Sequence, residues 1–243
     1  MKGYEKMSLS LSTVVFEVTR RCNMNCEHCL RGKAENMDLD TKYIDKFLEN
    51  VDYIQNITFS GGEPSLNVAA INYTLQKCKE LGIAVGGLYI VTNAKENTEE
   101  LAIAALRWYG YCEDFEKEYT CGITVSRDMF HDDVNMDNID VLRGLSFFRD
   151  DKTTDFNQVY LINEGRAEEL SGFKKRDVSD EEEDLICNID GEDGDVESLL
   201  YLCANGEIRN NCNTAFNNPY FTIGNLNDGS LLDVLREASL VMA

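Results

Sequence analysis

Apolar residues along the chain follow two alternating patterns, short β-branched runs and stripes at helical spacing. Residues 12–19, STVVFEVT, are rich in β-branched and aromatic residues and predict a strand. The next segment predicts an amphipathic helix, because apolar residues recur on one helical face at Ile44, Phe47, Leu48 and Val51. The chain therefore begins with one strand followed by one helix.

This alternation continues along the chain. Further strands are predicted over residues 56–59, 88–92, 121–125 and 159–162. Apolar stripes predict helices between them, and the last of these stripes contains Val141, Leu142, Leu145 and Phe148. Strands that alternate with helices indicate an α/β fold with a parallel sheet, open or curled into a barrel, and right-handed crossovers.

Residues suited to binding or catalysis follow the predicted strands. In parallel α/β folds the carboxyl ends of the strands share one edge, where ligands usually bind. We therefore expect one rim of the sheet to gather the residues at these ends, namely Cys22, Gly61, Asn93, Ser126 and Glu164.

The last third of the chain has a different composition. Residues 177–197 contain eleven acidic and no basic side chains, which is typical of a solvated linker or loop. A small hairpin around Ala204 and Asn205 and a helix over residues 231–241 follow it. We expect a core over residues 1–176, the acidic linker or loop over 177–197 and a C-terminal appendage over 198–243.

Charge and cysteine content narrow the classes of function. The formal net charge of −21 would repel nucleic-acid phosphates, so we do not expect a nucleic-acid partner. The chain has nine cysteines, and neither a secretory leader nor an apolar run of membrane-spanning length is recognisable. We expect a cytoplasmic protein without a membrane partner, in which clustered thiols bind metal or take part in redox chemistry.

Three cysteines form one compact motif. Cys22, Cys26 and Cys29 have the spacing C-x3-C-x2-C, which lets three thiolates of one loop bind three irons of a 4Fe–4S cluster. The fourth iron would then lack a protein ligand and could bind a small molecule. A zinc site is the alternative, with His28 as the only local candidate for a fourth ligand.

Together with a second motif, the cysteine motif resembles the radical S-adenosylmethionine (SAM) superfamily. His28 stands where that family usually has an aromatic ring, and residues 60–64, SGGEP, match its GGE motif after the next strand. The resemblance implies a partial (β/α)6-type TIM barrel with a small C-terminal appendage of hairpin and helix. It also implies that SAM is cleaved at one 4Fe–4S cluster to a 5′-deoxyadenosyl radical, which abstracts a substrate hydrogen.

The resemblance also implies contacts with SAM. Gly61 and Gly62 would approach its methionine part, with Glu63 in support. Asn93, Ser126 and Asp128 fall at strand ends that reach SAM in this family, although Ala94 replaces a usual glycine, and the guanidinium of Arg166 suits the SAM carboxylate. Ordinary loop capping is the alternative role of Asn93 and Ser126, and His131 either faces the substrate or is a solvated loop residue.

Later cysteines raise the question of a second cluster. Residues 202–212 and 223–226 resemble a shortened SPASM extension, called twitch, in which auxiliary clusters are common. Cys187, Cys203 and Cys212 would leave such a cluster one protein ligand short, and a hairpin that only covers the barrel is the alternative. Cys78, Cys112 and Cys121 lie in apolar surroundings and are expected in the core.

The resemblance favours modification of a peptide or protein substrate, with a flavodoxin or ferredoxin as electron donor. One alternative is an activase that installs a glycyl radical on another enzyme. A further alternative is a non-catalytic iron–sulfur or zinc-binding protein.

Overall fold

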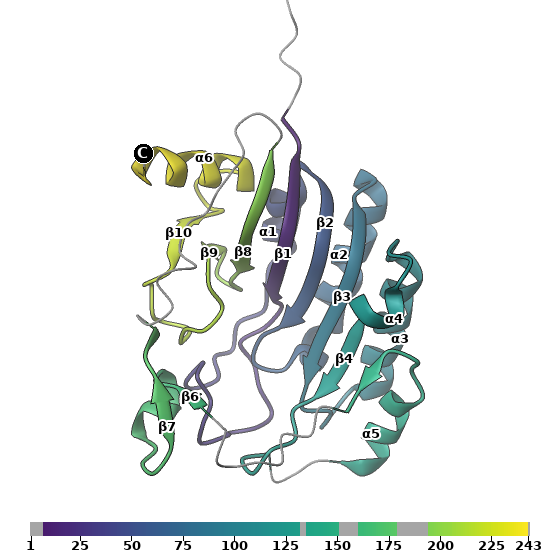
Figure 1. Cartoon of the computed structure of the whole chain (residues 1–243), viewed down its shortest axis with the longest axis vertical. Coiled ribbons are helices and arrows are strands. Elements are labelled where there is room, and N and C mark those ends of the chain that lie inside the picture. Colours follow the sequence, from purple (N-terminus) through teal and green to yellow (C-terminus); the bar gives the residue numbers. More distant parts are fainter. Residues whose placement is uncertain (1–6, 132–134, 151–159, 179–193, 243) are drawn as a thin grey trace, which may run out of the picture.

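The computed structural model describes residues 7–131, 135–150, 160–178 and 194–242, with side chains to residue 238 in the last segment. Eight strands form one sheet in the order β10-β9-β8-β1-β2-β3-β4-β5 (Figure 1). These strands are β1 (Leu9–Glu17), β2 (Val51–Ser60), β3 (Ala84–Thr92), β4 (Gly122–Val125), β5 (Phe148–Arg149), β8 (Asp195–Leu202), β9 (Glu207–Arg209) and β10 (Thr222–Asn225).

Most of the sheet is parallel. Strands β8, β1, β2, β3, β4 and β5 pair in parallel, whereas β9 and β10 add antiparallel to the β8 edge. The pairing leaves β5 and β10 as the two edge strands, so the sheet stays open. The expected α/β class with a largely parallel sheet is confirmed.

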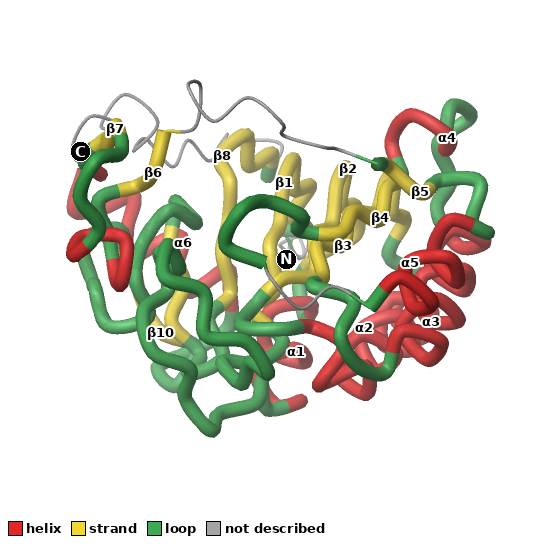
Figure 2. The backbone as a smooth tube through the Cα atoms, turned by 90° about the horizontal axis from the view of Figure 1, so that it is seen from below, coloured by secondary structure: helices red, strands yellow, loops and turns green. Residues whose placement is uncertain are grey.

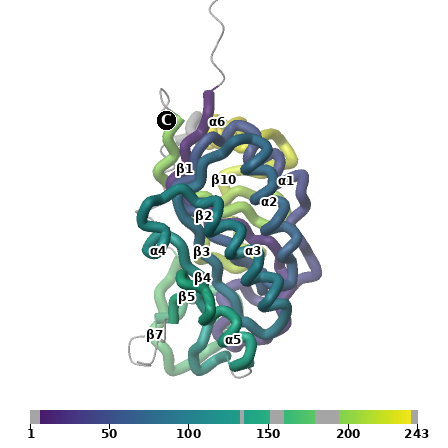
Figure 3. Tube along the Cα trace, turned by 90° about the vertical axis from the view of Figure 1, so that its right-hand side faces the viewer, coloured from purple at the N-terminus to yellow at the C-terminus, as the bar shows by residue number. Residues whose placement is uncertain are grey.

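Most of the helices cover one face of the sheet, as Figures 2 and 3 show. Phe59 and Trp108 pack together in the core beneath them, and the Trp108 indole donates to the Ile71 carbonyl at 3.1 Å. The helices are α1 (Thr41–Leu48), α2 (Val68–Leu81), α3 (Thr98–Tyr111), the short α4 (Lys117–Thr120), α5 (Met136–Arg143) and α6 (Leu231–Met242); the 3₁₀ turns are η1 (Pro64–Asn67) and η3 (Gly165–Glu169).

One prediction about the middle of the chain is wrong, and another holds only in part. Helix α5 ends at Arg143, so Leu145 and Phe148 do not extend its apolar stripe; Phe148 instead pairs with Ile123 in the sheet. The strand predicted over 159–162 is β6 (Tyr160–Ile162), but among the described residues it pairs only with β7 (Lys174–Arg176) and not with the main sheet. Hydrophobic periodicity identifies the strand but not its partner, because pairing depends on distant residues.

The C-terminal residues continue the main sheet. The predicted hairpin is present as β8 and β9, and β8 also pairs along β1 from Ser10 to Phe16. Helix α6 packs against β10 and α1. Of the predicted acidic linker, residues 179–193, including Cys187, lie outside the described residues. Within the described ranges, no helix is long and apolar enough to cross a membrane.

Candidate active site at the carboxyl ends of the strands

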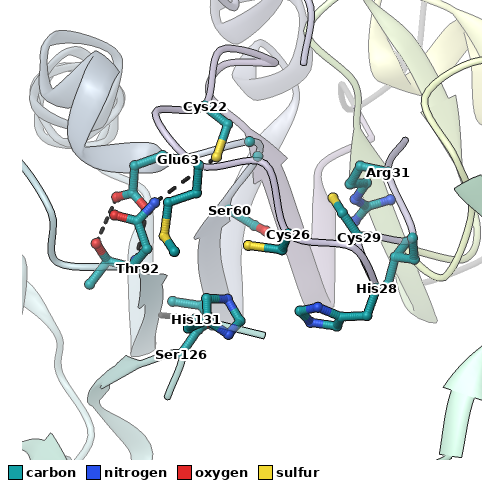
Figure 4. Close-up of a pocket in the computed structure, with 16 residues that line it drawn as sticks. Cys22, Cys26, His28, Cys29, Arg31, Ser60, Glu63, Thr92, Ser126 and His131 are labelled. Carbon is teal, nitrogen blue, oxygen red and sulfur yellow. Dashed lines mark hydrogen bonds between the residues drawn. The ribbon is translucent and has the colours of Figure 1, made fainter. Parts of the chain in front are cut away.

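The three motif cysteines line one pocket, which we call the central pocket. Cys22, Cys26 and Cys29 lie on the loop that leaves β1, and each is partly exposed. Turns formed by Cys29 N donating to Cys26 O at 3.2 Å and Gly32 N donating to Cys29 O at 3.1 Å curl this loop. Figure 4 shows the three side chains around one space, with Ser126 and His131 across from them.

The Gly61–Gly62 turn packs tightly against the start of the cysteine loop. A Cβ atom would lie 2.2 Å from the Thr19 carbonyl oxygen at Gly61 and 2.3 Å from the Arg21 carbonyl oxygen at Gly62. Gly62 N donates to Thr19 O at 2.7 Å, and Glu63 N donates to Arg21 O at 2.8 Å. The missing side chains therefore bring the two motifs into backbone contact, and both glycines also line the central pocket.

Glu63 joins this turn to the end of β3. Its carboxylate is buried and accepts from the Thr92 hydroxyl at 2.6 Å and from Asn93 N at 2.7 Å, while Ser65 N donates to it at 3.0 Å. Burial raises the pKa of Glu63 above its usual value, although these three donors act in the opposite direction. The side chain thus holds two strand ends together beside the pocket.

Asn93 and Ser126 both line the central pocket. Asn93 Oδ1 accepts from Lys95 N at 2.9 Å, which is a loop cap, and its Nδ2 donates to Asn23 Oδ1 at 2.8 Å. Ser126 N donates to the Thr92 carbonyl at 2.9 Å. Asn93 therefore caps its loop and also lines the central pocket, so the two alternatives, loop capping and a place at the SAM site, do not exclude each other for this residue.

Asp128 does not line the central pocket but supports residues that do. Its Oδ1 accepts from Phe130 N at 2.8 Å and bonds His131 Nδ1 at 2.7 Å, and its Oδ2 lies 3.6 Å from His28 Nε2. Burial is the largest single influence and opposes its ionisation, but the bonds from His131 and Phe130 N and the charges of the two histidines together outweigh burial and lower the Asp128 pKa. His131 lines the pocket with His28 and is not a solvated residue, since its side chain is 10% exposed.

The two histidines respond differently to this carboxylate. Burial would lower the pKa of His131, but its bonds to Asp128 and to Cys26 raise it to about 9. Burial lowers the pKa of His28, and Asp128 offsets only part of that effect. The ring of His28 stacks on Phe130 at a centroid distance of 4.4 Å. Ligand-type atoms of His28, Asp128 and His131 lie within 4.8 Å of one another.

Arg166 and Glu164 do not line the central pocket. The Arg166 guanidinium bonds the Asn25 side chain, and its backbone N donates to Cys29 O at 3.0 Å, so the η3 turn rests on the cysteine loop. The Glu164 carboxylate accepts from Ala215 N at 3.0 Å and from Asn218 Nδ2 at 2.7 Å. Both residues line a different cavity, which we call the outer pocket.

Sequence reasoning missed a buried network behind the cysteine loop. Glu17 at the end of β1 accepts from Arg20 Nε at 2.6 Å, from the Tyr201 hydroxyl at 2.7 Å and from Ala204 N at 3.0 Å. The guanidinium of Arg31 lies 4.8 Å from the Tyr201 ring and reaches the central pocket. An acidic residue at the end of an otherwise apolar strand was the one available signal.

The donor set fits an iron–sulfur cluster. Burial raises the pKa of Cys22, and the negative charges of Glu63, Cys26 and Cys29 raise it further. Three thiolates this close repel one another, so their joint ionisation requires nearby cations such as iron ions. The three thiol-bearing side chains on one curled loop would hold three irons and leave space in the pocket for a further ligand.

The other described cysteines lie mostly in the interior. Cys78, Cys112 and Cys121 are buried, as predicted. Cys203 and Cys212 belong to one small apolar cluster with Val15 and Tyr201, and burial raises the pKa of Cys203 to about 12. The auxiliary cluster stays a prediction.

Comparison with known families identifies the class of protein. Residues 16–141 match the Radical SAM superfamily, and this range is more than half of the chain. It includes the cysteine loop, the Gly61–Gly62 turn and strands β2 to β4. The chain therefore belongs to the radical SAM superfamily of enzymes.

Individual relatives are similar over shorter stretches. The uncharacterized protein MJ0907 of Methanocaldococcus jannaschii is 36% identical over 70 residues, which are 28% of this chain and 24% of that protein. The putative protein YfkA of Bacillus subtilis is 36% identical over 67 residues, 26% of this chain and 18% of the relative. The matched part thus spans a quarter or less of these relatives.

A solved structure shares the fold over nearly the whole chain. It is described as native anSMEcpe with bound AdoMet and Cp18Cys peptide, and it has a TM-score of 0.55, covering 95% of this chain and 82% of its own. The sequences are 9% identical, so this likeness concerns the fold.

Proposed function

We propose that this chain cleaves S-adenosylmethionine reductively at a 4Fe–4S cluster and uses the resulting 5′-deoxyadenosyl radical to abstract hydrogen from a peptide or protein. The observation that carries the proposal is the meeting of Cys22, Cys26 and Cys29 with the Gly61–Gly62 turn in one pocket of a radical SAM fold. A zinc site would not account for that glycine turn.

The cysteine loop would hold the cluster. Cys22, Cys26 and Cys29 would each bind one iron through the thiolate sulfur, and the fourth iron would stay open to the amino and carboxylate groups of SAM. Asn93 Nδ2 lies 4.0 Å from Cys22 Sγ and can donate a weak hydrogen bond to that sulfur. Such bonds to cluster sulfurs are one means by which a protein sets the reduction potential.

The Gly61–Gly62 turn would bind the methionine part of SAM through carbonyl oxygens. The N–H groups of Gly62 and Glu63 are already donated to Thr19 and Arg21, so they do not serve a ligand. Carbonyl oxygens of the turn remain suitable acceptors for the SAM ammonium group. Glu63 would act indirectly, by fixing the turn against β3.

A peptide or protein substrate is supported by the fold relative anSMEcpe, which was solved with bound AdoMet and a peptide. A one-electron donor of the flavodoxin or ferredoxin type would reduce the cluster, as the family resemblance implies. Both partners would be met in the cytoplasm, where a cluster with three cysteine ligands is kept from oxidation.

Anaerobic reconstitution with iron and sulfide, followed by SAM and dithionite, tests the proposal. The wild-type chain should form 5′-deoxyadenosine and methionine, detected by liquid chromatography. If the cluster loads but no 5′-deoxyadenosine forms, even with candidate peptides present, the proposal fails and the chain would be a non-catalytic iron–sulfur protein.

A cysteine substitution tests the ligand set. Cys26→Ala should lose the cluster and its absorbance at roughly 400 nm, because one of only three thiolate ligands is removed. Cys78→Ala is the matched control, since Cys78 is buried in α2 and should leave iron content unchanged. Full iron content in the Cys26→Ala protein would show that the ligands are elsewhere.

A further inference from the structure

A tight turn after β4 brings the His131 ring to the central pocket. Asp128 Oδ1 accepts from Phe130 N at 2.8 Å, and His131 N donates to the Asp128 carbonyl at 3.1 Å. An aspartate that bonds the backbone two residues further on in this way stabilises a turn with its own side chain. The turn therefore fixes where the His131 ring lies.

The His131 ring lies between a carboxylate and one cysteine of the motif. Its Nδ1 bonds Asp128 Oδ1 at 2.7 Å, and the ring also bonds the side chain of Cys26. Figure 4 shows His131 and Cys26 beside the same space. The side chain of His131 is mostly buried, so water competes little for these two bonds.

Iron binding would decide the direction of the bond between His131 and Cys26. As a cluster ligand Cys26 would be a thiolate, and a thiolate and an ionised carboxylate both accept hydrogen bonds. The ring would then donate on both sides, with Asp128 fixing its orientation, as carboxylates do for histidines at metal sites. A hydrogen bond donated to a cluster sulfur favours the reduced state, because reduction adds negative charge to the cluster.

We propose that His131, held in place by Asp128, donates a hydrogen bond to the Cys26 sulfur and thereby raises the reduction potential of the cluster. This inference rests on the proposed function, which requires the cluster to be reduced before SAM is cleaved. The contact of Asn93 with Cys22 at 4.0 Å is weaker, whereas the His131 ring is oriented by a second bond to a carboxylate.

A divalent metal ion is the competing use of the same side chains. Ligand-type atoms of His28, Asp128 and His131 lie within 4.8 Å of one another. The turn favours the hydrogen bond instead, because Asp128 Oδ1 already bonds both Phe130 N and the His131 ring. Metal analysis of the reconstituted wild-type chain separates the two uses.

A redox titration without SAM tests the inference. The reconstituted full chain is poised at a series of potentials, and the reduced cluster is measured by electron paramagnetic resonance. His131→Phe keeps a planar ring without a donor, so the ratio of reduced to oxidised cluster at the wild-type midpoint should fall about tenfold, or about 59 mV for a one-electron couple. Asp128→Asn should lower this ratio about threefold, because a neutral amide holds the ring less firmly than a carboxylate.

Met129→Leu is the matched control, because Met129 is exposed on the same turn and does not line the central pocket. Its potential should equal that of the wild type. Three results would overturn the inference: an unchanged potential in His131→Phe, an equal shift in Met129→Leu, or a metal ion beyond the four cluster irons that is lost with His131. If His131→Phe does not load iron, an unchanged potential in Asp128→Asn overturns it.

The titration is independent of the test of the proposed function, which is 5′-deoxyadenosine formation in the wild-type chain. An unchanged potential in His131→Phe with intact SAM cleavage in the wild type would reject only the role of His131. A shifted potential in His131→Phe without SAM cleavage in the wild type would reject only the proposed function.

Discussion

The central and outer pockets share the cysteine loop as a wall, but they are assembled differently. The central pocket depends on backbone contacts between the cysteine loop and the Gly61–Gly62 turn, with Thr92 and Asn93 close by. The outer pocket depends on side chains that reach across the chain, such as Glu164 to Ala215 and Arg31 to Thr214. We therefore expect the central pocket to tolerate few substitutions and the outer pocket to tolerate more.

This difference fits the role proposed for the central pocket. A cluster and SAM require fixed positions of several atoms, which close backbone packing supplies. Contacts between side chains, as in the outer pocket, leave more room for substitution while the backbone is kept. Substitutions in the two regions should therefore differ in kind as well as in size.

The largest effect is expected at Gly61. Its φ of +150° and the 2.2 Å approach to Thr19 O leave no room for a Cβ atom. Gly61→Ala should lower the free energy of unfolding by about 3 kcal/mol or more, and it should reduce iron loading as the two motifs separate. Chemical denaturation and iron analysis measure the two effects.

Gly110→Ala is the control for that substitution, because Gly110 lies in α3 and a Cβ atom added there would have nothing within 4 Å of it. It should stabilise the protein by up to about 1 kcal/mol through helix propensity. A loss of stability at Gly110 equal to that at Gly61 would remove the argument from close packing.

A smaller effect is expected at Glu63. In Glu63→Gln an amide NH₂ replaces one carboxylate oxygen and faces a donor, Thr92 or Asn93. The free energy of unfolding should fall by about 2 kcal/mol, and SAM should bind more weakly as the turn shifts. Denaturation and equilibrium dialysis measure these changes, and the exposed Glu96→Gln should alter neither.

The smallest effect is expected in the outer pocket. Glu164→Gln keeps one acceptor for Ala215 N but turns an NH₂ group toward a second donor. It should cost about 1 kcal/mol of stability while iron content and SAM affinity stay unchanged. Glu168→Gln, at an exposed position, should cost nothing measurable. Loss of the cluster in Glu164→Gln would mean that the two pockets are not separable.

The sequence predicts the central pocket well because its parts are local. Cys22 to Cys29 lie on one loop, and Gly61 follows the next strand, so parallel pairing brings them together. The carboxyl ends of β1 to β4 do gather Cys22, Gly61, Asn93 and Ser126 at one pocket, whereas Glu164 lies at the other.

Long-range pairing is what the sequence could not supply. The fifth predicted strand has a partner, β7, that no periodicity identifies, and β8 joins β1 across more than half of the chain. The bonds of Glu17 to Tyr201 and of Glu164 to Ala215 depend on that pairing. The outer pocket is therefore evident only in three dimensions.

The most direct test of the central claim is the electron paramagnetic resonance spectrum of the dithionite-reduced cluster with and without SAM. SAM bound to an iron that lacks a cysteine ligand should shift the signal, and the shift should be weaker at equal SAM concentration in Glu63→Gln. A reduced cluster whose spectrum stays the same at saturating SAM would contradict the account, because the open iron in the central pocket would not bind its ligand.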